Sequence, residues 1–360
     1  MKSIIKTNYN FISKLGDGSF GQVYLVTDKD NNKYACKVET KGLRKSSRLV
    51  SEHNLYKRFA YLHLKCVPTI YKYFETTENN YLVMELMGKS LSDILTDSNK
   101  FVDIGTVMKI GINIFSIIET IHKAGIIHRD IKPNNFMFGC DDNISKIYVI
   151  DFGLSKKWLN GGISHISYKS GLSLVGTARY ASNNVHLGIE QSRRDDMEAI
   201  GYMLVYLAKG SLPWQGLKKK NRYSSIDEIG LKKQSVSVSS LCEDLPKCFY
   251  DYIKYTRKLE FTEKPNYDYV RKLFIDCANE LNIKLKYYWE EDKEELIIDN
   301  NIDIDENINI DNIIDETDKK SNEVCNAIFD RKLKEPKKKS ITNDSRRRTP
   351  KNKIFNKINK

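Results

Sequence analysis

The stretch from residue 127 to residue 153 constrains the fold of this chain more than any other. It contains IHRDIKPNNF, a short connection and then IYVIDFG. Two acids, a lysine and an amide lie at fixed spacings within it: Asp130, Lys132, Asn135 and Asp151. Metal-assisted phosphoryl transfer needs such groups, because it asks a protein to position reactants and to neutralise charge on phosphate oxygens.

Each of these residue types suits one task in that chemistry. A carboxylate beside the attacking hydroxyl orients it and accepts its proton, which suits Asp130. Lys132 would carry its charge toward the transferring phosphate. Asp151 and Asn135 offer the hard oxygen ligands that Mg²⁺ prefers. The two motifs could be chance triplets, but H-R-D-x-K-x-x-N followed by D-F-G after a β-branched run is highly specific.

A glycine-rich turn precedes this region, formed by Gly16, Asp17, Gly18, Ser19, Phe20 and Gly21. In a dinucleotide-binding fold the same spacing opens a helix, whereas here it joins two predicted strands, Phe11–Gly16 and Gln22–Thr27. We therefore expect a hairpin that covers the triphosphate of ATP, with backbone amides close to the phosphates because glycine has no side chain.

Lys37 lies in the next predicted strand, Tyr34–Val38. Four residues of the following segment recur at i, i+3, i+7 and i+10 and would line the inward face of one helix: Leu49, Glu52, Tyr56 and Phe59. A charge on an apolar face needs a partner. The pattern predicts a Lys37–Glu52 ion pair that aims the ammonium at the α- and β-phosphates.

Two more predicted strands, 67–74 and 80–86, would complete a small antiparallel sheet. Met84 would then lie at the back of the nucleotide pocket, and Glu85 to Met87 would form a hinge whose backbone groups pair with the adenine edge. A helix is expected to start after Ser90. Asp93 in its first turn could reach the ribose hydroxyls or could only cap the helix, and both interpretations remain open.

Composition bounds the rest. The 360 residues have room for a two-lobed catalytic domain and an extension. Seven scattered cysteines predict reduced thiols and not a disulfide framework or zinc site. The start of the chain lacks the apolar core of a signal peptide. The apolar run 107–121 is interrupted by Lys109, Asn113 and Glu119, which favours a buried helix over a membrane span.

The segment after D-F-G resembles the casein kinase I family of serine/threonine protein kinases. Its irregular, polar part (154–173) is similar to an activation segment. Three runs carry the resemblance: GTARYASNNVHLGIEQSRRDDMEAIGY (176–202), SLPWQGL (211–217) and FTEKPNYDYVRKLF (261–274). The resemblance covers about residues 9–289. It implies an α+β, bilobal protein-kinase fold, with a small antiparallel sheet and one main helix in an N-lobe (1–87) and a larger, mostly helical C-lobe (88–289).

The resemblance also implies roles. Asp130 would be the catalytic base, Asn135 and Asp151 would hold magnesium, and Asp196 would brace the catalytic loop. Lys132 followed by proline is typical of serine/threonine kinases. Six residues would enclose the adenine: Leu15, Val23, Ala35, Met84, Met137 and Ile150. An inactive pseudokinase scaffold is the alternative, but it predicts loss of a catalytic residue, and none is lost.

This family prefers protein substrates with acidic or phosphorylated residues N-terminal to the acceptor. Arg179 matches the family's anion-site arginine, and arginine suits phosphate binding. Arg222 either matches a second basic residue or belongs to a solvated basic run. The sequence departs from the family at Leu172, where a lysine is common and only Lys169 lies nearby.

From about residue 290 the chain becomes acidic and rich in Asn and Ile, and it ends in basic clusters at 337–339 and 346–348. We expect residues 290–360 to be mostly disordered. The clusters could serve nuclear import, contact nucleic acid or an acidic protein, or form a generic basic tail. We expect a monomer without membrane attachment, in the cytoplasm, the nucleus or both.

Overall fold

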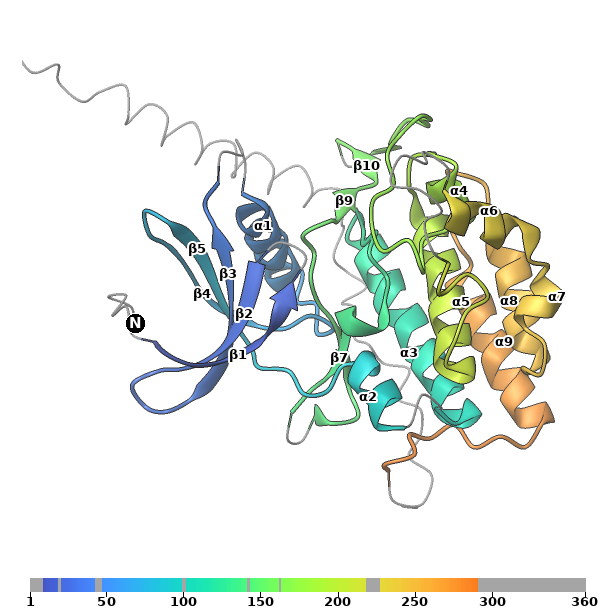
Figure 1. The fold of residues 1–360 in the computed structure, drawn as a ribbon, viewed down its shortest axis with the longest axis horizontal. Coiled ribbons are helices and arrows are strands. Elements are labelled where there is room, and N and C mark those ends of the chain that lie inside the picture. Colours follow the sequence, from blue (N-terminus) through green and yellow to red (C-terminus); the bar gives the residue numbers. More distant parts are fainter. Residues whose placement is uncertain are drawn as a thin grey trace, which may run out of the picture. The chain divides into compact units, whose positions relative to one another are not determined.

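A five-stranded antiparallel sheet forms the N-terminal part of the computed structural model (Figure 1). The structure describes residues 9–18, 21–42, 47–98, 102–140, 143–161, 163–217 and 227–290. The strands are β1 (Asn10–Gly18), β2 (Gly21–Thr27), β3 (Lys33–Thr40), β4 (Ile70–Glu75) and β5 (Asn79–Met84). Their order in the sheet is β1-β2-β3-β5-β4.

Strand register decides which side chains share a face of this sheet. Val23 lies opposite Lys37, and Ala35 lies opposite Met84. Directly opposed residues and those two apart on one strand point to the same side. The face that carries Lys37 therefore also carries Val23, Ala35 and Met84, while a separate cluster that includes Val26 and Cys36 covers the other face.

The strand limits differ from the expectations at several points, and β5 ends at Met84 and not at residue 86. β1 continues through Gly18, which pairs with Gly21, so the expected start of the turn at Gly16 is wrong. Residues 19 and 20 lie outside the described residues. β4 begins at Ile70 and not at residue 67. Pro68 explains the later start, because proline has no N–H to donate to a ladder.

Helix α1 (Arg48–Tyr61) packs beside the sheet and buries the four residues that the periodicity predicted: Leu49, Glu52, Tyr56 and Phe59. Ser47 caps its first turn by accepting from the amide of Val50 at 3.1 Å. Burial of one stripe fixes the rotation of the helix, so that Glu52 is directed inward, to Lys37.

The C-terminal part is helical around a long apolar helix, α3 (Ile104–Lys123). This helix has the length and apolarity of a membrane span, but 72% of its most apolar window is buried inside the protein, as expected for a core helix. The other helices of the described ranges are α2 (Leu91–Asp97), the 3-10 turn η1 (Pro133–Asn135), α4 (Asn183–His186), α5 (Arg193–Lys209), α6 (Glu228–Ser235), α7 (Val238–Leu241), α8 (Lys247–Thr256) and α9 (Tyr267–Glu280).

Short strands connect these helices: β6 (Ile126–Ile127), β7 (Phe136–Phe138), β8 (Ile147–Val149), β9 (Lys156–Lys157), β10 (Leu159–Asn160) and β11 (Ser164–His165). The expectation that residues 154–173 contain no regular element is wrong, because β9 pairs with β6 and β10 pairs with β11. Each of these strands has only two residues, too few for the alternation of polar and apolar residues that predicts a strand.

The last described residues return to α3. The hydroxyl of Tyr287 accepts a hydrogen bond from Asn113 at 2.8 Å, and Lys109 pairs with Glu290 at 2.7 Å. The chain therefore leaves the described structure at an anchored point, Glu290.

Candidate active site

The loop after β6 is fixed from the helix α5. The carboxylate of Asp196 accepts hydrogen bonds from the amides of His128 and Arg129 at 2.7 and 2.9 Å. Arg129 has φ 66°, in the left-handed region. Two amides bonded to one buried carboxylate hold the loop in this costly conformation. The predicted contact between Asp196 and the loop is thus present.

Asp130 lies at the centre of this loop and is only 4% exposed. Its Oδ2 accepts from the ammonium of Lys132 at 2.6 Å and from the amide of Asn135 at 3.3 Å. Its Oδ1 accepts from the hydroxyl of Thr177 at 2.7 Å. Donors on both oxygens hold the carboxylate in one orientation, as a general base requires.

A second acid, Asp151, follows β8 and is linked to the sheet. Lys37 donates to Asp151 at 2.8 Å and to Glu52 at 2.7 Å, so the predicted ion pair is present and extends to a third residue. Burial by itself would lower the pKa of Lys37, but the two carboxylates raise it overall. Burial would raise the pKa of Asp151, yet the charge of Lys37 outweighs it and lowers that pKa. Lys37 and Asp151 are therefore charged at neutral pH, whereas burial raises the pKa of Glu52 against the charge of Lys37.

Backbone contacts connect the two acidic loops. The amide of Ile150 donates to the carbonyl of Asn135 at 2.9 Å, and His128 Nε2 donates to the carbonyl of Ile150 at 3.0 Å. His128 Nδ1 accepts from the amide of Asp130 at 3.2 Å, so this ring is the Nε2–H tautomer. Asp130 and Asp151 thus belong to one connected site.

The sequence of this chain also matches the model of a known protein family. The model of the protein kinase domain matches residues 9–270 of the 360. The chain belongs to the protein kinase family. The sheet, the single helix beside it and the helical part are the two lobes of this α+β fold, and the predicted fold class is confirmed. Protein kinase domains in general use ATP and a divalent metal to transfer a phosphoryl group.

The glycine-rich hairpin of this kinase packs on β3. A Cβ built on Gly21 would lie 2.0 Å from the carbonyl oxygen of Val38, so only glycine fits there. Gly16 pairs with Val23 and Gly18 with Gly21, and Asp17 forms an exposed ion pair with Lys14 at 2.6 Å. Ser19 and Phe20 lie outside the described residues.

The hinge after β5 leaves backbone groups for a ligand. In the backbone contacts that the structure describes, the carbonyl of Glu85 and the amide and carbonyl of Met87 have no partner. The Glu85 side chain instead turns away to accept from the amide of Thr69 at 3.0 Å. The hinge can therefore serve an adenine edge only through its backbone.

Three of the residues predicted to enclose the adenine are partly accessible. Met137 and Ile150 are half-buried, and Leu15 is 50% exposed. Each of these side chains therefore has surface that a bound adenine could cover.

Asp93 forms a capping box with Ser90. Its Oδ2 accepts from the amide and the hydroxyl of Ser90 at 2.8 and 2.7 Å, while Ser90 Oγ accepts from the amide of Asp93 at 3.1 Å. The capping interpretation of Asp93 is confirmed. A ribose contact stays a prediction.

Oxygen ligands suited to a hard cation are present at the junction of the two loops. Asn135 directs its amide nitrogen to Asp130, and in the described contacts neither its Oδ1 nor Oδ2 of Asp151 has a donor. The described residues contain no cluster of three or more His, Cys, Asp or Glu able to hold a metal. Two protein ligands still fit magnesium, which usually keeps waters and binds through substrate phosphates.

Thr177 is a site residue that sequence reasoning missed. The preceding Gly176 has φ 102°, and a Cβ built there would lie 2.3 Å from the carbonyl oxygen of Arg129. This close approach of two backbones brings Thr177 to Asp130. In the sequence, Gly176 is the signal that two backbones could approach closely at this point. The sequence does not say which other segment of the backbone lies there.

The predicted anion site is described in part. Arg179 is exposed, and its guanidinium lies 5.3 Å from the ring centroid of Tyr206. It forms no ion pair with an acidic residue in the described ranges. Arg222 lies outside the described residues.

Proposed function

We propose that this protein is an active serine/threonine kinase of the casein kinase I type. It transfers the γ-phosphoryl group of ATP to a serine or threonine of protein substrates that are acidic or already phosphorylated. The observation that carries the proposal is the Asp130 carboxylate, held by Lys132 and Thr177 and connected to the Lys37–Asp151 pair.

The arrangement assigns one task to each side chain. Asp130 orients the acceptor hydroxyl and takes its proton, and the donors on its two oxygens hold it in one orientation for this task. Lys132 lies beside Asp130 and offers positive charge to the transferring phosphoryl group. Lys37, held by Glu52, binds the α- and β-phosphates. Asn135 and Asp151 would hold Mg²⁺, which supplies neutralisation of phosphate charge.

The substrate class follows from two features. Lys132-Pro133 favours serine and threonine as acceptors, and the resemblance of residues 176–202 favours the casein kinase I type. Arg179 is exposed without a carboxylate partner among the described residues, so it is available to a phosphate or carboxylate of the substrate. An inactive pseudokinase would instead need the loss of a catalytic residue.

Phosphoryl transfer to matched peptides tests this proposal. The peptides share one serine acceptor and differ only in phosphoserine, aspartate or alanine at a position N-terminal to it, with threonine and tyrosine versions of each. We expect phosphoserine and aspartate peptides to be preferred and tyrosine to be inert. Transfer only to tyrosine, or equal use of all N-terminal residues, would contradict the assigned class.

Two variants separate activity from binding. Asp130→Asn should lower kcat by about 10²-fold or more and leave ATP affinity nearly unchanged, because the base acts on the acceptor. Arg179→Gln should raise KM for the phosphoserine peptide alone, with Lys254→Gln as an exposed control. Nucleotide binding without turnover by the unaltered protein would support the pseudokinase.

A further inference from the structure

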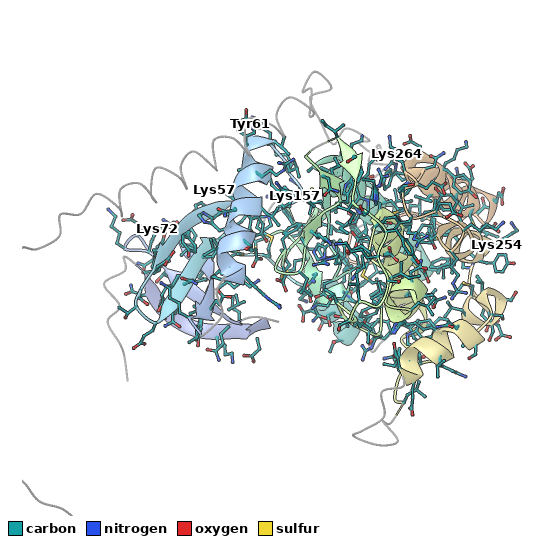
Figure 2. All side chains as sticks on the ribbon, turned by 90° about the horizontal axis from the view of Figure 1, so that it is seen from above. Lys57, Tyr61, Lys72, Lys157, Lys254 and Lys264 are labelled. Atoms are coloured by element: carbon teal, nitrogen blue, oxygen red, sulfur yellow. The ribbon has the colours of Figure 1, made fainter. Side chains whose placement is uncertain are left out.

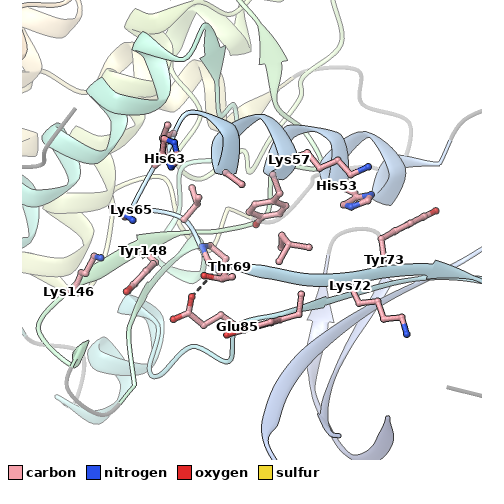
Figure 3. Close-up of a pocket in the computed structure, with 17 residues that line it drawn as sticks. His53, Lys57, His63, Lys65, Thr69, Lys72, Tyr73, Glu85, Lys146 and Tyr148 are labelled. Atoms are coloured by element: carbon pink, nitrogen blue, oxygen red, sulfur yellow. Dashed lines mark hydrogen bonds between the residues drawn. The ribbon is translucent and has the colours of Figure 1, made fainter. Parts of the chain in front are cut away.

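A basic cavity lies on the rear of the N-lobe, on the side to which the Glu85 side chain turns. Its volume is about 510 Å³, and it is enclosed by α1, by β4 with the loop before it, and by the start of β8. Figure 3 shows His53 and Lys57 on the helix, Lys72 and Tyr73 on β4, and Lys146 beside Tyr148. The cavity thus lies outside the residues assigned to catalysis.

Four lysines from separate segments line this cavity: Lys57, Lys65, Lys72 and Lys146. All four are exposed, and none forms an ion pair with an acidic residue in the described ranges. Some other exposed lysines of the described surface do, such as Lys41 with Glu75 at 2.7 Å, so the feature of this cavity is that four unpaired lysines line one hollow. Like charges gathered without counter-charges repel one another, so an anionic occupant would stabilise the folded state.

The lining does not neutralise these lysines. Glu85 is the acidic residue among the lining residues, and its one negative charge, on a carboxylate bonded to the amide of Thr69 (Figure 3), offsets only one of the four lysines. The rings of His53 and Tyr73 stack at a centroid distance of 4.6 Å and provide a flat apolar surface between the charges. The cavity therefore suits a chain segment that alternates carboxylates with aliphatic side chains.

Residues 291–306 have this composition. They contain eight Asp or Glu, one Lys and five Leu or Ile. They follow Glu290, which accepts from the hydroxyl of Ser145 at 2.9 Å, and Ser145 directly precedes the lining residue Lys146. Sixteen residues can span up to about 50 Å when extended, so the whole cavity is within reach.

We infer that the acidic segment 291–306 of the same chain docks in this cavity, with its carboxylates on the four lysines and its aliphatic side chains on the stacked rings. The site is separate from the proposed catalysis and does not depend on it. Tethering favours this occupant, since a segment attached beside its site has a high effective concentration.

Zero-length carbodiimide cross-linking of the full-length protein, followed by mass spectrometry, tests the inference. This reagent joins a lysine to a carboxylate only when the two are in contact. We expect cross-links from residues 291–306 to Lys57, Lys65, Lys72 and Lys146 within one molecule, with a yield independent of protein concentration.

Variants on both partners sharpen the test. K57E/K72E should lower cross-linking to the remaining Lys65 and Lys146 by about tenfold. The control variant K254E/K264E changes two exposed lysines of the other lobe (Figure 2) and should leave that cross-linking unchanged. E291Q/D292N/E294Q/E295Q should lower it as well, and D311N/D315N/E316Q/D318N removes as many charges outside the segment and should not. Cross-links to other lysines, cross-links between molecules only, or none at all would overturn the inference.

Discussion

Asp130, the base in the proposed reaction, shows how neighbouring donors fix the orientation of one carboxylate. Lys132 and Thr177 donate to its two oxygens, and Asn135 also donates to its backbone carbonyl at 2.8 Å. Hydrogen bonds to a charged acceptor are roughly twice as strong as neutral ones. The base is therefore oriented before a substrate arrives, and Thr177 positions it without reacting.

Replacing Thr177 tests this positioning role. Thr177→Val keeps the shape and removes the donor, and we expect kcat to fall about 10-fold or more, because a hydrogen bond to a charged group is lost. Thr177→Ser keeps the hydroxyl and should retain most of the activity. Steady-state kinetics with a peptide substrate measures both. If the Val and Ser variants lose kcat equally, the hydroxyl is not what orients Asp130.

Lys233 is a second residue whose surroundings set its state, in this case its protonation. It is fully buried in α6, donates to the carbonyl of Ala181, and lies 4.7 Å from the ring centroid of Tyr202. Burial lowers its pKa from 10.5 to about 7, against the charges of Glu198 and Asp227. The lysine thus connects α6 to the segment that carries Thr177.

This pKa makes stability depend on pH. Between pH 7 and 10.5 the unfolded chain keeps a proton that the folded protein releases, so the free energy of unfolding should rise with pH, by at most roughly 1 kcal/mol per pH unit. Below pH 7 both states are protonated and the term is constant. Urea denaturation should show this rise in the native protein and in Lys232→Met, an exposed neighbour, but not in Lys233→Met. Parallel curves for all three would contradict the lowered pKa.

At the scale of elements, capping explains where the helices begin. Ser47 caps α1, the Ser90–Asp93 box begins α2, and Asp103 accepts from the amide of Thr106 at 2.9 Å to begin α3. Each cap satisfies a first-turn amide that has no partner within its helix. The start of α2 matters for function because the helix begins directly after the hinge.

Asp93→Ala separates capping from a ribose contact. With the capping box lost, the free energy of unfolding should fall by about 1 kcal/mol. If capping is the main role, KM for ATP should stay within about twofold, and Asp97→Ala, at the other end of α2, should change neither quantity appreciably. A clear rise of KM without a loss of stability would show instead that Asp93 serves the nucleotide.

At the scale of the whole molecule, a small set of polar contacts joins the two lobes in the part of the chain that the structure describes, including the bond from the amide of Val149 to the carbonyl of Cys66 at 2.9 Å. Lys37 reaches Asp151, the amide of Phe152 donates to Glu52 at 3.2 Å, and Arg58 donates to the carbonyl of Ala124 at 3.1 Å. The ring of Phe152 packs on Phe59, with centroids 4.8 Å apart. A nucleotide that contacts both lobes should therefore add appreciably to the interactions between them.

Thermal denaturation measures that addition. An ATP analogue with magnesium at about 100 times its Kd should stabilise the protein by about 2.7 kcal/mol and raise Tm by several degrees. Chelation of the metal should reduce the shift, and Lys37→Met should nearly abolish it, whereas the exposed Lys264→Met should not. An equal shift in Lys37→Met would mean that the nucleotide binds elsewhere.

The sequence predicted most of the catalytic set because local patterns encode it. Helical periodicity directed Glu52 inward to Lys37, and the spacing of HRDIKPNN and DFG placed Asp130, Asn135 and Asp151 on two loops. The limits of strands were less accurate. The end of β1 depends on its pairing with β2, which periodicity within one strand does not contain. The start of β4 follows Pro68, a local signal that the predicted limits of that strand did not take into account.

The sequence by itself therefore determined the fold class, the protein kinase family and most of the residues that meet at the candidate active site, since each rests on neighbours along the chain. Only the tertiary structure decided that Thr177 bonds Asp130, that Asp93 caps a helix, that Glu85 turns to the rear, and that four distant lysines share one cavity. Some of these are contacts between segments that are far apart in the sequence, and the others are choices of side-chain rotamer. Both depend on how the side chains pack in the folded protein.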